Sequence, residues 1–134
     1  MPGVFIEIYD ALEGMGYNLQ MNDSETGFTF NFNLELAVCR FDDESNVVTF
    51  IVPSVRKIDL DEEYDEAVRR VNSRNHVGRL VNIDGSAISA VSSFLVCNLS
   101  GIESQVRFAI EDLNRLIEDF YKFIVRTDDI PAFE

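Results

Sequence analysis

The sequence predicts an α+β fold, in which helices pack mainly on one face of an antiparallel sheet of about five strands. Two observations lead to this prediction. In three segments the apolar residues recur at a spacing of three and four, which is typical of amphipathic helices. The segments between them alternate in polarity or form short apolar runs bounded by turn residues. The expected order is α-β-β-β-α-β-β-α, with no sign of a parallel crossover.

Length and charge narrow the class of protein. The 134 residues are expected to form a single domain over 1–126, followed by a short acidic tail over 127–134. The net charge of −13 repels nucleic-acid phosphates and anionic lipid, although it could attract basic partners. No apolar run is long enough to span a bilayer, and the first residues lack the basic region of a signal peptide. We therefore expect a cytoplasmic protein that binds neither nucleic acid nor membrane.

The first helix is expected from Val4 to Met15, because its apolar residues share one stripe. Gly14 and Gly16 end it, since glycine readily adopts the left-handed conformation of a helix terminus. Residues 17–21 form a short extended piece, a possible extra edge strand. In the next segment three rings alternate with polar residues, which predicts a half-buried strand. Those rings are Phe28, Phe30 and Phe32.

Two further strands are expected before the second helix. The segment 35–41 is apolar on both faces, and the β-rich run 47–52 is closed by Pro53, which cannot donate to a sheet ladder. The polar residues 42–46 between them form a turn. Short polar turns between adjacent strands indicate an antiparallel meander.

The second helix is expected over 59–72 and the hairpin after it over 77–97. Asp59 or Asp61 is the expected N-cap, and the acidic residues that follow suit the positive end of the helix dipole. Asp84-Gly85 is strong hairpin-turn chemistry. The apolar stripe of this helix consists of Tyr64, Ala67, Val68 and Val71.

The third helix has the longest apolar stripe in the chain. Ser100 and Glu103 match a capping box, in which a serine is followed three residues later by a glutamate. About six helical turns follow with one apolar face. That face consists of Ile102, Val106, Ala109, Ile110, Leu113, Leu116, Ile117, Phe120 and Ile124.

Several runs of residues, taken with this order of elements, carry a resemblance. They are Gly16-Tyr17, Gly27-Phe28-Thr29-Phe30, the strand 47–52 closing on Pro53, and Val71-Asn72-Ser73-Arg74-Asn75 leading into Val77-Gly78-Arg79-Leu80-Val81 and Asp84-Gly85. Over about residues 4 to 124 the chain resembles the type III secretion chaperone-like fold and, within it, the YbjN-like family of proposed bacterial sensory-transduction regulators. The resemblance implies a small, often dimeric, non-enzymatic protein that binds other proteins. It transfers no catalytic residues.

No motif for catalysis, a cofactor or a metal is found in the sequence. Cys39 and Cys97 each lie in an apolar run, as buried free thiols do, and their separation fits neither a disulfide framework nor a zinc site. The single histidine, His76, has no evident partner base. We therefore expect no catalytic residue, no cofactor and no metal. The alternative is a small-ligand or enzymatic site at the one polar cluster, Asn72, Arg74, His76 and Arg79.

The favoured hypothesis is a protein-binding module, expected to be a homodimer. The strands at 35–41 and 87–97 are apolar on both faces, so one layer of helices leaves apolar surface uncovered. The expected interaction residues are Tyr64, Phe94, Leu95 and Val96. An acidic mimic of nucleic acid ranks last, because most of the negative charge lies at helix starts and turns.

Overall fold

The computed structural model describes residues 2–21, 27–32, 35–57, 62–75, 77–83 and 87–132. It has the predicted order of helices and strands, with one strand more, between the first helix and the strand of phenylalanines. The elements are α1 (Pro2–Gly14), β1 (Leu19–Met21), β2 (Gly27–Phe32), β3 (Glu35–Asp42), β4 (Val47–Lys57), α2 (Glu62–Arg74), β5 (Arg79–Ile83), β6 (Ala87–Leu95), the short 3-10 helix η1 (Leu99–Gly101) and α3 (Ile102–Ala132).

The described strands form one sheet in the order β1-β2-β3-β4-β6-β5, with every neighbouring pair antiparallel. The predicted α+β class is confirmed. The sheet has six strands rather than about five, because the possible edge piece at 17–21 does pair with β2 as β1. The hairpin turn expected at Asp84-Gly85 lies outside the described residues, but β5 and β6 on either side of it pair from Ile83↔Ala87 onward.

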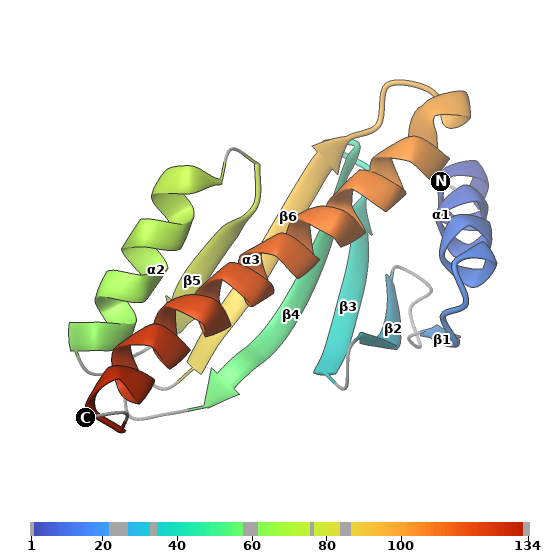
Figure 1. Ribbon diagram of the computed structural model, residues 1–134. Coiled ribbons are helices and arrows are strands. Elements are labelled where there is room, and N and C mark those ends of the chain that lie inside the picture. The colour runs from blue at the N-terminus through green and yellow to red at the C-terminus, as the bar shows by residue number, and fades with distance from the viewer. Residues whose placement is uncertain are drawn as a thin grey trace.

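One face of this sheet is covered by the helices (Figure 1). α3 runs diagonally across the strands, with α1 beside its first half and α2 beside its last half. Phe28, Phe30 and Phe32 all point into this covered side and are almost fully buried. They belong to the same core as the α3 stripe from Ile102 to Ile124, so the predicted common interior is confirmed. Burial of so many large apolar side chains accounts for most of the driving force for folding.

The termini of α1 and α3 show how local sequence sets the helix ends. Gly16 has a φ of 95°, and the Tyr17 N–H donates to the Leu12 carbonyl (3.2 Å) while the Gly16 N–H donates to that of Glu13 (2.9 Å). This Schellman arrangement confirms that Gly16 ends the helix. The expected capping box at the start of α3 is wrong. The chain first forms η1, whose cap is the Asn98 side chain, which accepts from the Gly101 N–H (3.0 Å).

Two elements extend beyond their expected ends. β4 continues past Pro53 to Lys57 through a break in register between Val52 and Arg56. A bulge tolerates proline because no ladder N–H is required there, and the carbonyls of Pro53 and Val55 accept from the hydroxyls of Ser89 and Tyr121. The helical backbone of α3 reaches Ala132, whereas a separate tail was expected from residue 127. Once a packed helix has formed, further residues join it with little free-energy change.

The two cysteines differ, whereas both were expected to be buried. Cys39 lies in the core and is free, and burial raises the pKa of its thiol. Cys97 is exposed, because β6 ends at Leu95 and the chain leaves the sheet there. None of the described helices has the length and hydropathy needed to cross a membrane.

Candidate functional site

The sheet face opposite the helices, called the open face below, is defined by strand register. Paired residues share a face, and side chains alternate along each strand. One row of such pairs crosses the whole sheet, through Gln20, Thr29, Val38, Ile51, Val91 and Arg79. The neighbouring rows add Asn31, Leu36, Arg40, Val47, Thr49, Val81, Ser93 and Leu95.

The middle of the open face is an apolar band, consisting of Leu36, Val38, Ile51, Val81 and Val91. Leu36 is 53% exposed and Val81 38%, and the other three are half-buried by their neighbours in the sheet. In the described part of the chain every helix packs on the other side (Figure 1). A contiguous apolar surface left uncovered in this way is typical of a site that binds another macromolecule.

The charge on the open face differs in sign from that of the whole chain. Arg40 lies next to Val38 along β3, and Arg79 pairs with Val91. Among described positions the register places a single acid on this side, Asp42, in the outermost row. Its carboxylate accepts from the Ser45 hydroxyl (2.8 Å) and the Glu44 N–H (3.1 Å), and these bonds lower its pKa. Asp42 therefore belongs to the β3–β4 turn. Of the two arginines, Arg40 lies beside the band, whereas the Arg79 guanidinium donates to the carbonyls of Asn72 and Asn75 at the end of α2.

The four expected interaction residues do not form one surface. Leu95 is 55% exposed and lies on the open face at the end of β6. Phe94 points to the covered side, where its ring stacks on that of Phe50 with centroids 6.4 Å apart. Val96 is half-buried, and its N–H donates to the Asn46 carbonyl (2.8 Å). Tyr64 is half-buried against the core from α2. The structure thus brings only Leu95 to the open face.

Both edges of the sheet are poorly suited to adding a strand. β1 is three residues long. On β5 the N–H of Leu80 donates to Oδ1 of Asn72 (2.7 Å), while the Leu80 carbonyl accepts from Nδ2 of the same side chain (2.9 Å). This amide occupies the backbone groups of Leu80, in the middle of the β5 edge, and so interferes with an incoming strand.

The alternative polar cluster is only partly assembled. Asn72 is bound to Leu80 as described, and Arg79 donates from NH1 to the Asn72 carbonyl (2.7 Å), at the C-terminal end of α2. Arg74 lies elsewhere, in a small groove of about 60 Å³ between α2 and α3. His76 lies outside the described residues. The polar groups that do meet are bonded to backbone, so they stabilise the helix end.

A shallow depression of about 490 Å³ lies at this end of α2. It is open to solvent and is lined by Arg69, Asn72, Ser73, Asn75 and Arg79. Most of this lining comes from α2 and the residue after it, and none of the described lining residues belongs to the apolar band. Among the residues that the structure describes, no group of three or more His, Cys, Asp and Glu side chains is placed to hold a metal ion.

A buried polar network beside this depression escaped the sequence analysis. The Asp112 carboxylate, 1% exposed, accepts from Nδ2 of Asn75 (2.9 Å) and from the Ser92 hydroxyl (2.8 Å). Gly78 packs against it so closely that a Cβ there would lie 2.5 Å from Oδ2 of Asp112. The sequence feature that could have revealed this network is the acidic residue at position 112, within the apolar stripe of α3. The network joins α2, β6 and α3, and it is satisfied internally, which suits a structural role.

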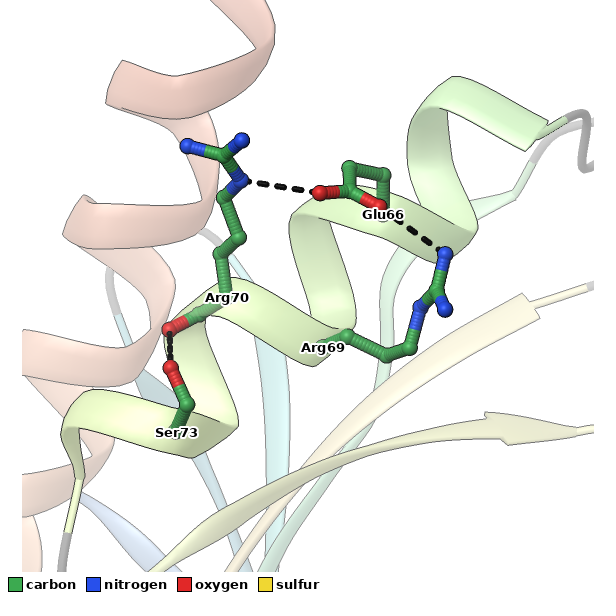
Figure 2. A network of polar contacts seen from close by, with 4 residues as sticks. All are labelled: Glu66, Arg69, Arg70 and Ser73. Carbon is green, nitrogen blue, oxygen red and sulfur yellow. Dashed lines mark hydrogen bonds and ion pairs between the residues drawn. The ribbon is translucent and has the colours of Figure 1, made fainter.

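The outer surface of α2 carries ion pairs rather than a ligand site. Figure 2 shows the Glu66 carboxylate between Arg70, whose Nε lies 2.9 Å away, and Arg69, whose NH2 lies 2.9 Å away. The hydrogen bond from Arg70 lowers the pKa of Glu66. The Ser73 hydroxyl donates to the Arg70 carbonyl one turn earlier (2.8 Å). These groups are exposed, so each pair contributes little stability.

Comparison with solved structures identifies the fold without relying on the sequence pattern. An uncharacterised protein from Methanothermobacter thermautotrophicus superposes with a TM-score of 0.65 at 13% identity, over 92% of this chain and 98% of that one. YbjN from E. coli, a proposed transcription regulator, gives a TM-score of 0.61 at 14% identity, over 93% and 92%. The type III secretion chaperone SycH of Yersinia pestis, solved with a stable fragment of YscM2, gives 0.60 at 9% identity, over 90% and 98%.

The chain therefore has a YbjN-like, secretion chaperone-like α+β fold, as the sequence resemblance implied. No family model matches the sequence, and a search of curated proteins finds no relative. At these identities the likeness concerns the fold.

Proposed function

We propose that this protein is a non-enzymatic protein-binding module, of the chaperone-like or regulatory kind, and that it holds its partner on the open face. The observation that carries the proposal is the apolar band, which no described helix covers. The solved neighbours support it, because one is a chaperone bound to a protein fragment and another a proposed regulator. The bonding of Asn72 and Arg79 to backbone supports a role without catalysis.

We further propose that the protein is a cytoplasmic homodimer that pairs through another surface. Ile6 on α1, Leu99 in η1 and Phe108 on α3 are exposed apolar side chains away from the open face. Both cysteines are free, as is usual in a reducing compartment. Sedimentation at about 100 µM is expected to show a dimer, since this exceeds the micromolar dissociation constants of many weak complexes. A strict monomer at that concentration would contradict the dimer.

The binding function is tested by selecting peptides from a random display library on the immobilised protein. We expect enriched peptides whose binding is lost in Leu36→Glu, because this substitution places a charge inside the contact. The matched control is Met21→Glu, since Met21 is 47% exposed but is the register partner of Phe28 and so lies on the covered side. Both sites are exposed, so both variants should fold, which circular dichroism checks. Failure to enrich any peptide, or equal loss in the two variants, would contradict the proposal.

A further inference from the structure

We infer that the partner segment held by the open face is an acidic amphipathic helix, meaning a helix whose apolar stripe is flanked by Asp or Glu. This inference rests on the proposed function and adds the chemistry of the partner. Three observations lead to it: the spacing of the apolar band, the state of the two sheet edges, and the sign of the charges beside the band.

The spacing of the band fits a helix that lies across the strands. Val38, Ile51 and Val91 are direct register partners on β3, β4 and β6. Neighbouring strands are about 4.8 Å apart, so these three side chains span about 10 Å. Two turns of α-helix rise about 10.8 Å, and they present apolar residues at about the same interval. One helical stripe at positions i, i+3 or i+4, and i+7 can therefore contact all three.

The sheet edges favour a helix over an added strand. The backbone of Leu80 on β5 is already bonded to the Asn72 side chain, and β1 offers only three residues. A strand binds mainly through main-chain hydrogen bonds along an edge, whereas an amphipathic helix binds through side chains on an apolar surface. The open face supplies the second kind of contact.

The charges beside the band select the flanking residues of that helix. Arg40 lies beside the band on β3, and its guanidinium has no hydrogen-bond or ion-pair partner among the described side chains. The arginines near the β5 edge are already bonded, Arg79 to the Asn72 carbonyl and Arg69 to the Glu66 carboxylate, which leaves Arg40, among the described residues, as the cation that faces a partner. An acidic residue one turn beyond the stripe would meet this cation. The net charge of −13, taken alone, would instead favour a basic partner. Comparing an acidic with a basic peptide therefore distinguishes the two expectations.

The test uses two synthetic helical peptides of about 18 residues, a length at which an alanine-rich helix becomes stable. Both carry the same leucine stripe, and one has glutamates beside the stripe where the other has lysines. Fluorescence anisotropy is expected to show that the acidic peptide binds about tenfold more tightly at low salt, equal to about 1.4 kcal/mol, with the difference shrinking as salt screens the charges.

Single substitutions test whether the open face is the source of the preference for the acidic peptide. Arg40→Glu is expected to reverse it, and Leu36→Glu to abolish binding of the acidic peptide. Arg107→Glu is the matched control, because Arg107 is an exposed arginine on α3, where it pairs with Glu103 of the same helix. That variant is expected to leave the preference unchanged.

Four results would overturn the inference: equal or tighter binding of the lysine peptide, no binding of either peptide, acidic binding that survives Leu36→Glu, and a dimer that Leu36→Glu dissociates. The library-selected peptides show whether the inference about the acidic helix fails alone or together with the proposed binding function. If those peptides still require Leu36 while the acidic preference is missing, the binding function stands and only the partner chemistry is wrong.

Discussion

The two faces of the sheet are made by the same strands but have different chemistry. On β4, Phe50 is fully buried beneath the helices, and its neighbour Ile51 is half-exposed on the open face. The strand residues on the covered side include aromatic rings from β2, β4 and β6, which contact one another and Tyr17. The described positions of the open face carry no aromatic residue.

This difference in composition follows from what each face packs against. Aromatic side chains supply the volume that fills the space between a sheet and the helices over it. Aliphatic and small polar side chains on the open face, with Arg40 beside them, keep each uncovered apolar patch small. The covered face is suited to permanent burial, and the open face is suited to the partner that we propose.

The largest expected effect contrasts neighbouring positions on β4. Phe50→Ala should lower the free energy of unfolding by about 3–5 kcal/mol, because it leaves a cavity in the core. Ile51→Ala should lower it by about 1 kcal/mol, since part of that side chain is already in water. Urea denaturation measures both. Similar losses for the two variants would show that the faces do not differ in burial.

A second prediction concerns the polar network within the covered side. In Gly78→Ala the new Cβ would meet Asp112, Leu116 and the backbone carbonyl of Val91, all within 2.8 Å. Overpacking of this kind should destabilise the protein by about 1–3 kcal/mol in urea denaturation. Gly14→Ala is the matched control, because Gly14 lies in α1 with nothing within 4 Å, and it should be neutral or slightly stabilising. Equal effects of the two substitutions would mean that Gly78 is not confined.

The smallest expected effect lies on the outer surface of the covering helices. The pKa of Glu66 is lowered, first by the hydrogen bond from Arg70, so its contribution is present above glutamate's ordinary pKa of 4.5 and is lost as the pH falls through the lowered value. Glu66→Gln should lower the melting temperature by about 2 °C or less at pH 7, and by less still near pH 3. Glu111→Gln, on the exposed side of α3, serves as the control. A large effect that persists in acid would contradict this account.

The layered arrangement of sheet and helices could be predicted from the sequence, because hydrophobic periodicity is a local property of each segment. The alternation at Phe28, Phe30 and Phe32 and the long stripe of α3 each identify one buried face, and the two faces can only pack on each other. Strand β4 was cut short at Pro53, because a bulge depends on groups distant in the sequence. The hydroxyl of Tyr121, which bonds the Val55 carbonyl, is one of them.

The candidate site was harder to predict than the fold. Apolar residues on both faces of the segment 35–41 did indicate an uncovered surface. Which side each residue of β6 takes depends on its register with β4 and β5, so Phe94 and Leu95 were grouped although they point apart. Likewise, Asn72 and Arg79 belonged to the alternative hypothesis of a ligand site, because the sequence does not show that their bonds go to backbone.

The two thiols differ in accessibility, so their rates of chemical modification report on opening of the core. Cys97 is accessible two residues beyond the end of β6, close to Leu95, whereas Cys39 is sealed between β2 and β4 with a raised pKa. Since the thiolate is the reactive form, a maleimide dye attaches selectively at Cys97 of the native protein. Modification of Cys39 then requires the strands to separate. The rate of this modification therefore measures opening of the core, and no engineered probe is needed.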